Sequence, residues 1–368
     1  MRICVFTPTF FPTMGGAEVV VDALARQFTL HGHDAVVLTP RVGDGPGKGL
    51  PYAVAHYRKP MLPQWFPERI SSALKRLHRQ RPLDVVLALY GQPTGYAAIR
   101  ARQRTGVPVV LRCPGGDLYR HGRTRRHPHR WRRVVAAYRQ ADAVVAISPY
   151  IEQLIREVVP EARRLTQIPN GVDAEAIRAP AEPPADLPTH RPFCLCLGNL
   201  IAQKGFDDAI NAFADAGEAI AGLDMIVVGQ GKLGEALRQQ ADARGLAGRV
   251  HFLGQRTGND KRWLLQNCRF GVMPSREEAF GIVALEFLAA GKPLLCSQSP
   301  AFDAMYEHEV NGLRVEAGDV PALASGMTRL WRGELADVAA VNARRLEPFN
   351  WPAVAQRYLE LLEAVCAR

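Results

Sequence analysis

The chain has 368 residues, which is long for one domain and sufficient for two of ordinary size. Hydrophobic residues make up 47% and charged residues 22%, as in a folded globular protein, and no apolar run reaches the ~18–20 residues that a membrane-spanning helix needs. The net charge of +10 is uneven, since residues 1–180 carry +14 and residues 181–368 carry −4, and this indicates an anionic partner for the first half, such as nucleic acid, a membrane or a charged acceptor.

The first residues, MRICVFTPTF, are interpreted as a strand of a folded domain, because they lack the separate charged region, apolar core and cleavage site of a signal peptide. Amphipathic helices, for example 17–30 and 94–104, follow some of the strands. The strands predicted in this first series are 2–7, 34–39, 84–89, 107–111 and 143–147.

Residues 174–192 carry five prolines, a density incompatible with a central strand or helix interior, so this segment is the predicted linker. A second series of strands is predicted at 193–197, 224–228, 249–253, 269–273 and 293–296. Apolar strands that alternate with helices indicate an α/β fold with parallel sheets covered on both faces. Residues 351–367 are predicted to form an amphipathic helix with an apolar stripe at Val354, Tyr358, Leu361, Leu362 and Val365.

The seven cysteines are predicted to be reduced core thiols, because most of them lie in apolar runs and their number is odd. Cys194 and Cys196 share one face of a strand, but no second Cys or His pair stands near them in the sequence. No metal site is predicted.

The most informative motif is 274–286, PSREEAFGIVALE, which follows a predicted strand and runs into a predicted helix. The first N–H groups of such a helix form an anion site suited to a diphosphate. These groups would belong to Phe280, Gly281, Ile282 and Val283. Glu278 and Glu286 bracket the helix start and, at ~1.5 Å per helical residue, lie at most ~12 Å apart along the axis, which suits sugar hydroxyls at one carboxylate and ribose hydroxyls at the other. Alternatively, Glu278 and Ser275 cap the helix and Glu286 faces solvent.

Three other loops carry candidate residues, each with a structural alternative. Lys204 precedes a predicted helix and either places its charge on a phosphate or is a solvated side chain. Gly15 and Gly16 follow the first strand and allow either close approach of a ligand or a tight turn into the helix. Asp117, at the end of another strand, could hydrogen-bond sugar hydroxyls or cap a turn.

Residues 120–133, RHGRTRRHPHRWRR, contain seven arginines, three histidines and no acidic residue. A solvated face is one interpretation, and an anionic surface or acceptor is the one we favour, because the run adjoins the loop of Asp117. Metal binding by His121, His127 and His129 is not expected among so many arginines.

Together these stretches resemble the retaining glycosyltransferases of family 4, which have the GT-B fold. The resemblance covers essentially the whole chain. It is carried by Gly15-Gly16, Pro169–Asp173, Leu197-Gly198, Lys204-Gly205, Val228–Gly231, Phe252–Gly254, Asn311–Leu313, Phe349–Trp351 and, above all, Glu278 and Glu286 with seven residues between them.

The resemblance implies two Rossmann-like domains facing across a cleft, residues 1–173 on the acceptor side and 190–349 binding the nucleotide sugar, with 350–368 returning to the first domain. It also implies that Glu278 contacts donor-sugar hydroxyls and Glu286 the ribose. Lys204 and the amides near Gly281 would hold the diphosphate. Catalytic roles thus fall to Glu278, Lys204 and Asp117, and donor contacts also to the loops of Gly15, Gly16, Asn199 and Gly254.

Two positions depart from the family pattern. Asn199 stands where the family usually has Arg, and Pro114 stands where many members have His before Gly. Those missing groups normally touch phosphate and sugar, so donor identity and rate are affected and the fold is not. Lys204 is then expected to be the main cation on the diphosphate, with Arg112 or Arg256 supplying part of the missing charge.

The predicted function is that of a retaining hexosyltransferase: metal-independent transfer of a sugar, with retention of the anomeric configuration, from a UDP- or GDP-sugar to a glycan or lipid-linked acceptor. The nucleotide sugar is bound as a substrate and not as a cofactor. No Asp-x-Asp sequence is present, in agreement with metal independence. The resemblance suggests polysaccharide or lipopolysaccharide biosynthesis. We expect a cytoplasmic protein, peripheral on the inner face of the cytoplasmic membrane, that does not bind nucleic acid. Three alternatives remain: a nucleotide-sugar epimerase or hydrolase, a nucleic-acid-binding protein that uses the arginine run, and a non-catalytic sugar-binding relative.

Overall fold

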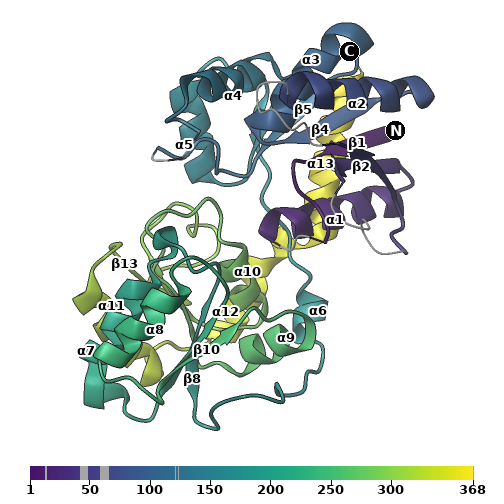
Figure 1. Cartoon of the computed structure of the whole chain (residues 1–368). Helices are drawn as coiled ribbons and strands as arrows, with labels where there is room; N and C mark the ends of the chain where they lie inside the picture. The colour runs from purple at the N-terminus through teal and green to yellow at the C-terminus, as the bar shows by residue number, and fades with distance from the viewer. Residues whose placement is uncertain (13–14, 42–48, 59–65, 121, 123, 368) are drawn as a thin grey trace. The chain divides into compact units, whose positions relative to one another are not determined.

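The computed structural model describes residues 1–12, 15–41, 49–58, 66–120, 122 and 124–367, and Figure 1 shows the chain. The chain divides into two compact units. Unit 1 comprises Met1–Gly171 and Trp351–Arg368, and unit 2 comprises Val172–Asn350. Among the residues described, no helix is long and apolar enough to cross a membrane.

Unit 1 is built on a parallel seven-stranded sheet in the order β3-β2-β1-β4-β5-β6-β7. The central strands are buried along their whole length, as expected for strands covered on both faces. The strands are β1 (Arg2–Phe6), β2 (Asp34–Pro40), β3 (Ala53–Tyr57), β4 (Val85–Leu89), β5 (Val109–Cys113), β6 (Ala143–Ala146) and β7 (Leu165–Gln167).

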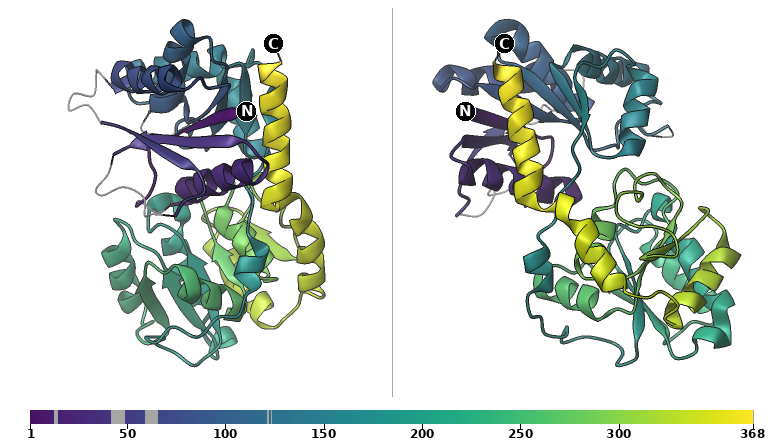
Figure 2. Two further views of the ribbon diagram at one scale, coloured as in Figure 1. Left: turned by 90° about the vertical axis from the view of Figure 1, so that its right-hand side faces the viewer. Right: turned by 180° about the vertical axis from the view of Figure 1, so that it is seen from behind.

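Helices cover this sheet, and the C-terminal helix, yellow in Figure 2, is one of them. It buries Trp351, Val354, Tyr358 and Leu362. The helices of unit 1 are α1 (Gly16–Leu30), α2 (Phe66–Gln80), α3 (Tyr96–Thr105), α4 (Pro128–Gln140), α5 (Pro149–Val158) and α13 (Trp351–Cys366), with a single π-helical turn, η2 (Gly91–Gly95), after β4.

Unit 2 is built on a parallel six-stranded sheet in the order β10-β9-β8-β11-β12-β13. Its strands are β8 (Phe193–Leu197), β9 (Asp224–Val228), β10 (Val250–Gly254), β11 (Gly271–Met273), β12 (Leu294–Ser297) and β13 (Gly312–Val315). Its helices are α6 (Ala174–Arg178), α7 (Phe206–Ala216), α8 (Gly234–Ala243), α9 (Gly258–Asn267), α10 (Ile282–Ala289), α11 (Val320–Trp331) and α12 (Val338–Leu346), with 3₁₀ turns η3 (Ala202–Lys204), η4 (Gly217–Ile220) and η5 (Glu347–Phe349).

The predicted fold class is confirmed: both units are α/β, with the doubly wound strand order of Rossmann-like domains. The strands and helices predicted by range agree with the structure to within two residues at each end. The sequence pattern missed β3, β7 and β13, which lie at sheet edges. Edge strands need little apolar surface, and the partly exposed Leu165–Gln167 of β7 shows the weak pattern that results.

The predicted linker is less irregular than its prolines indicated, because it begins with α6. Asp173 caps this helix by accepting a hydrogen bond from the N–H of Ala176 at 2.8 Å. The helix ends at Arg178, before Pro180, the first of the five prolines, so the rule that excludes proline from helix interiors is respected.

The cysteines lie as predicted. All seven thiols are free, and six are buried. Burial raises the pKa of Cys4, Cys196, Cys268 and Cys296 to about 12, which keeps these thiols protonated and unreactive at neutral pH. Cys366, at the end of α13, is partly exposed.

Candidate functional site

In an open parallel sheet, ligands bind outside the carboxyl ends of the strands where the strand order reverses. In unit 2 this switch point lies between β8 and β11. The loops that leave these two strands contain Lys204 and Glu278, respectively. Two residues chosen from separate sequence motifs are therefore brought to one place by the topology.

The backbone at this edge of unit 2 is packed closely around glycines. Gly198 and Gly229 follow β8 and β9, and the N–H of Gly198 donates to the carbonyl of Val228 at 3.0 Å. Gly229 has a φ of +148°, and a Cβ there would overlap the carbonyl of Gly198. Gly254, at the end of β10, accepts a hydrogen bond from the N–H of Gly229 at 2.8 Å. The three strand ends thus present backbone at the edge where a ligand would lie.

The loop of Lys204 is fixed to the loop of Glu278 by backbone contacts. Gly205 has a φ of +65°, and a side chain there would collide with the carbonyl of Pro274. The N–H of Arg276 donates to the carbonyl of Gln203 at 2.8 Å, and its guanidinium donates to Asp207 and Asp208 at 2.7 and 2.6 Å. This network sets the spacing between the two loops.

Lys204 and Glu278 form an ion pair in which Nζ lies 2.6 Å from Oε2. Glu278 is buried, and the hydroxyl of Ser275 lies 3.4 Å from the same oxygen. The helix α10 is capped by Gly281 without a side-chain hydrogen bond, so the alternative in which Glu278 caps this helix does not hold.

The predicted anion site lies at the N-terminus of α10. The first intrahelical hydrogen bond runs from the N–H of Leu285 to the carbonyl of Gly281 at 3.1 Å, so the N–H groups of Ile282 and Val283 precede the helical hydrogen-bond ladder. Phe280 and Gly281 are buried beside them. Amides that precede the helical ladder are groups that can bind an anion, and the anion site at residues 280–283 stays a prediction.

Glu286 does not face solvent, so the alternative in which it is a solvated side chain does not hold. Its side chain is 15% exposed and its Oε1 lies 2.6 Å from Nζ of Lys261 in α9. The other oxygen, Oε2, is buried and has no hydrogen-bond partner among the residues described. A buried carboxylate oxygen without a donor favours a ligand hydroxyl at this position. Lys261 was not foreseen, because no local motif connects it with Glu286.

The remaining donor-side candidates differ in their surroundings. Asn199 is exposed at the end of β8. Arg256, after β10, is held by Asp186 of the linker at 2.5 Å and by Asp260 at 3.1 Å. Arg112 is in a different position from the one expected for a phosphate ligand: it is 2% exposed in β5 of unit 1 and donates to Tyr358 at 3.1 Å and to Asn170. It joins α13 to the sheet of unit 1, and the prediction that it supplies charge to the diphosphate is wrong.

In unit 1, the switch point lies between β1 and β4, and the loops there hold Gly15 and Tyr90. Gly15 caps α1, and both Gly15 and Gly16 are exposed. A Cβ on Gly15 would lie 2.7 Å from the buried carboxylate of Glu18. Glu18 therefore approaches Gly15 closely, and both alternatives for the paired glycines, close approach of a ligand and a tight turn into the helix, stay predictions.

Asp117 is turned into the core of unit 1. It is 5% exposed and accepts hydrogen bonds from the N–H of Gly91 and, at 3.4 Å, from the hydroxyl of Tyr138. This geometry favours the structural alternative for Asp117, in which it holds a turn, here the loop after β4. Burial raises its pKa from 3.8 to about 6, although the hydrogen bond from Gly91 opposes this shift.

The arginine run surrounds the start of α4. His121 and Arg123 lie outside the described residues. Arg120 pairs with Glu157 at 2.7 Å, and Arg125 stacks over Trp131 with its guanidinium carbon 4.6 Å from the ring centre. Arg126, Arg130 and Arg132 are exposed, and none of them occurs in an ion pair of the described residues. Within the described part of the chain, no group of three His, Cys, Asp or Glu residues could hold a metal ion.

Comparison with known proteins agrees with this architecture. The family profile described as "Glycosyl transferases group 1" matches residues 180–346, and the profile described as "Glycosyltransferase Family 4" matches residues 14–176.

Among curated relatives, glycogen synthase of Mycobacterium tuberculosis is 30% identical over 308 residues, which are 78% of this chain and 70% of the relative. Among solved structures, sucrose-phosphate synthase of Thermosynechococcus elongatus is 22% identical, with a TM-score of 0.86 over 100% of this chain and 99% of that chain. An Anabaena protein, Alr3699/HepE, solved in complex with UDP-glucose, is 21% identical, with a TM-score of 0.80 over 99% of this chain and 100% of that chain.

The two family profiles and the curated relative identify the chain as a glycosyltransferase, and the solved structures show that it has the GT-B fold. The chain belongs to the family 4 glycosyltransferases.

The buried Asp117 gives a pH prediction. Its pKa in the folded state, about 6, is above its ordinary value of 3.8, so the folded protein binds more protons than the unfolded chain between these values. The favourable contribution of Asp117 to the free energy of unfolding is present at pH 4 and lost as the pH rises through 6. At 1.36 kcal/mol per pKa unit, this loss is about 3 kcal/mol. Between pH 4 and 7, Asp117→Asn should therefore gain stability relative to the parent protein, measured by urea unfolding. Parallel pH profiles of the two proteins would contradict the burial of an ionisable Asp117.

Proposed function

We propose that the protein transfers a sugar from a nucleotide-sugar donor, a UDP- or GDP-sugar, to a glycan or lipid-linked acceptor, with retention of the anomeric configuration and without a metal ion. The observation that carries this proposal is the ion pair of Lys204 and Glu278 beside the N-terminus of α10, together with the Glu286 oxygen in α10 that has no partner within the described part of the chain. The binding of UDP-glucose by the structurally similar Anabaena protein supports a nucleotide sugar as donor.

Different residues of unit 2 contact different parts of the donor. The amides at the start of α10 and the ammonium group of Lys204 hold the diphosphate. Glu278 accepts hydrogen bonds from hydroxyls of the donor sugar, and Glu286 accepts them from the ribose. Because Lys204 and Glu278 already contact each other, donor binding exchanges their mutual ion pair for contacts to the ligand, and neither charge is left without a partner.

The transfer step requires stabilisation of the departing diphosphate. As the bond from the anomeric carbon to the phosphate oxygen breaks, negative charge grows on the diphosphate, and the fixed amides and Lys204 stabilise it. The acceptor oxygen forms its bond to the anomeric carbon on the face of the sugar that the diphosphate leaves. The proton of the acceptor hydroxyl passes to the departing phosphate oxygen. This step balances without a protein nucleophile.

The roles of the three charged residues make distinct kinetic predictions. Lys204→Ala should lower turnover by ~10–100-fold and weaken donor binding less, because a charge-assisted hydrogen bond of ~1.5–3 kcal/mol strengthens as the leaving group gains charge. Glu278→Gln should also impair turnover, whereas Glu286→Gln should mainly weaken nucleotide binding. Steady-state kinetics and calorimetry with the free nucleotide separate the effects, with Lys75→Ala on α2 as a lysine control. Near-normal turnover in Lys204→Ala, or unchanged nucleotide affinity in Glu286→Gln, means that the roles are assigned incorrectly.

The stereochemistry and the metal requirement are tested together. Product NMR should show a retained anomeric configuration, and activity should persist in EDTA, because the amides and Lys204 supply the positive charge that a metal would otherwise provide. An inverted product rejects the stereochemical part of the proposal, and loss of activity in chelator with recovery in Mn²⁺ rejects the metal-independent part. Consumption of donor without any acceptor would instead indicate an epimerase or hydrolase.

We further propose that the arginine run binds anionic lipid or an anionic glycan acceptor at the cytoplasmic face of the membrane. Each basic residue near an anionic surface contributes about 1 kcal/mol, and salt screens the attraction. Replacement of the exposed Arg126, Arg130 and Arg132 by Gln should therefore weaken co-sedimentation with anionic vesicles by roughly 10–100-fold at low salt.

The matched control for this prediction replaces three exposed basic residues of unit 2, Lys232, Arg332 and Arg344, by Gln. It changes the net charge equally and should bind vesicles nearly as well as the parent. Equal binding of the parent to neutral and anionic vesicles, or binding to neither, argues against the membrane proposal.

A further inference from the structure

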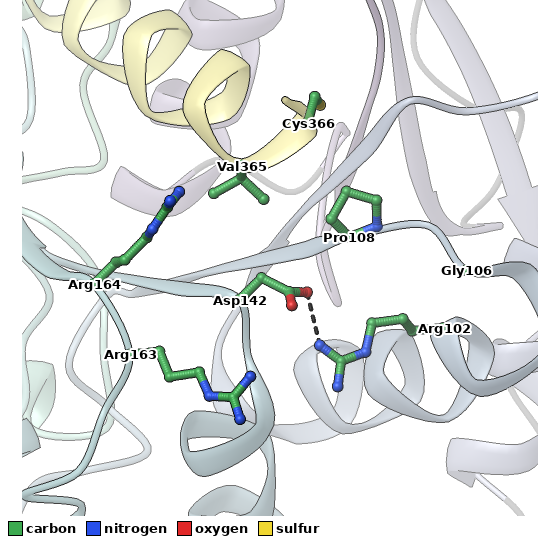
Figure 3. Close-up of a pocket in the computed structure, with 8 residues that line it drawn as sticks. All are labelled: Arg102, Gly106, Pro108, Asp142, Arg163, Arg164, Val365 and Cys366. Atoms are coloured by element: carbon green, nitrogen blue, oxygen red, sulfur yellow. Dashed lines mark hydrogen bonds and ion pairs between the residues drawn. The ribbon is translucent and has the colours of Figure 1, made fainter. Parts of the chain in front are cut away.

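A pocket lies in unit 1, at the amino edge of the sheet, and we call it the amino-edge pocket (Figure 3). Its volume is about 540 Å³, within the range of small-molecule sites. Pro108, Asp142 and Arg164 of its lining directly precede β5, β6 and β7. The donor site proposed above lies in unit 2, and none of the residues that line this pocket was assigned to it or to the arginine run.

The polar lining of the pocket is predominantly basic. Arg102 and Asp142 neutralise each other, with 2.7 Å between Nη1 and Oδ2, and Asp142 also accepts from the N–H of Val109 at 2.8 Å. Arg163 and Arg164 remain, and neither occurs in an ion pair of the described residues. Figure 3 shows Arg163 near Asp142 and Arg164 beside the last turn of α13. Two positive charges are thus uncompensated in one pocket.

Arg164 has an unusual backbone conformation and contacts the end of α13. Its φ is +43°, a left-handed conformation that a residue other than glycine rarely adopts. One nitrogen of its guanidinium donates to the carbonyl of Ala364 at 2.7 Å, which compensates the partial negative charge at the end of α13. Among the described residues, Ala364 is the hydrogen-bond partner found for this guanidinium, which has five N–H donors.

The rest of the lining is apolar. The ring of Pro108 and the side chain of Val365 form part of the wall, and the thiol of Cys366 lies at its margin (Figure 3). Guanidinium groups match the geometry of a phosphate through paired hydrogen bonds, and an apolar wall suits the neutral remainder of a small organic molecule.

We propose that the amino-edge pocket binds the phosphate group of a small soluble phosphomonoester, with Arg163 as the ligand of the phosphate and Arg164 adding positive charge beside the end of α13. Because the pocket joins the last turn of α13 to the loops before β5, β6 and β7, the bound ligand holds the end of α13 against the sheet of unit 1. The proposal does not depend on the sugar-transfer reaction.

Cys366 provides a direct test, because it lines the pocket and the other six cysteines are buried. We expect glycerol 3-phosphate to slow alkylation of Cys366 by iodoacetamide in the full chain, saturably and at constant ionic strength. Inorganic phosphate should protect in the same way, since the phosphate group is the part recognised. Arg163→Gln, a change at an exposed side chain, should weaken the apparent affinity roughly tenfold or more, as expected for loss of a charge-assisted hydrogen bond.

Two controls make the outcome decisive. Cys366→Ser should remove the labelling signal, and Arg104→Gln, which neutralises an exposed arginine of α3 outside the pocket lining, should leave protection unchanged. Equal protection by acetate at the same ionic strength would show a general anion effect and overturn the proposal. No saturable protection, unchanged affinity in Arg163→Gln, or protection by anionic vesicles alone would overturn it as well.

Discussion

The close contact between the loops after β8 and β11 is the constraint on which the candidate site depends. The absence of a side chain at Gly205 lets its backbone approach the carbonyl of Pro274, and Arg276 ties the second loop to the first. Only with these loops joined can Lys204 reach Glu278 at 2.6 Å. The parallel sheet supplies the place, since its strand order reverses between β8 and β11, and the loop contacts supply the spacing.

The two carboxylates of the site are held in different ways, and this difference follows the roles proposed for them. Glu278 shares its Lys204 partner with the expected diphosphate, so its contacts can change as charge moves during transfer. Glu286 lies within α10 and is paired with Lys261 through Oε1, while its Oε2 has no hydrogen-bond partner among the described residues. A carboxylate that is positioned before binding loses little conformational freedom on binding, which suits recognition of the nucleotide.

The sequence predicted those parts of the molecule that local patterns determine. The apolar strands and the helix after Gly281 follow from short-range periodicity and propensity, and Glu278 and Glu286 lie within one motif of the resembled family. Local sequence patterns do not identify Lys261, because only the folded structure brings α9 and α10 into contact.

The sequence prediction was wrong where burial determines the role of a residue. The position of Arg112 near a strand end predicts a ligand of the diphosphate, but its guanidinium is buried and donates hydrogen bonds to Tyr358 and Asn170, which are distant in sequence. The amino-edge pocket is lined by residues between Arg102 and Arg164 and by Val365 and Cys366 at the end of α13. No sequence spacing relates these two parts of the chain.

The central claim is that unit 2 binds a nucleotide sugar at its carboxyl edge, and a thermal-shift panel of UDP-, GDP- and ADP-sugars tests it most directly. A ligand present at ~100 times its dissociation constant stabilises the folded protein by about 2.7 kcal/mol, which is a measurable rise in the melting temperature. The account predicts such a rise with a UDP- or GDP-sugar and a smaller rise at the same concentration in Glu286→Gln. No rise with any nucleotide sugar, or an equal rise in Glu286→Gln, would contradict it.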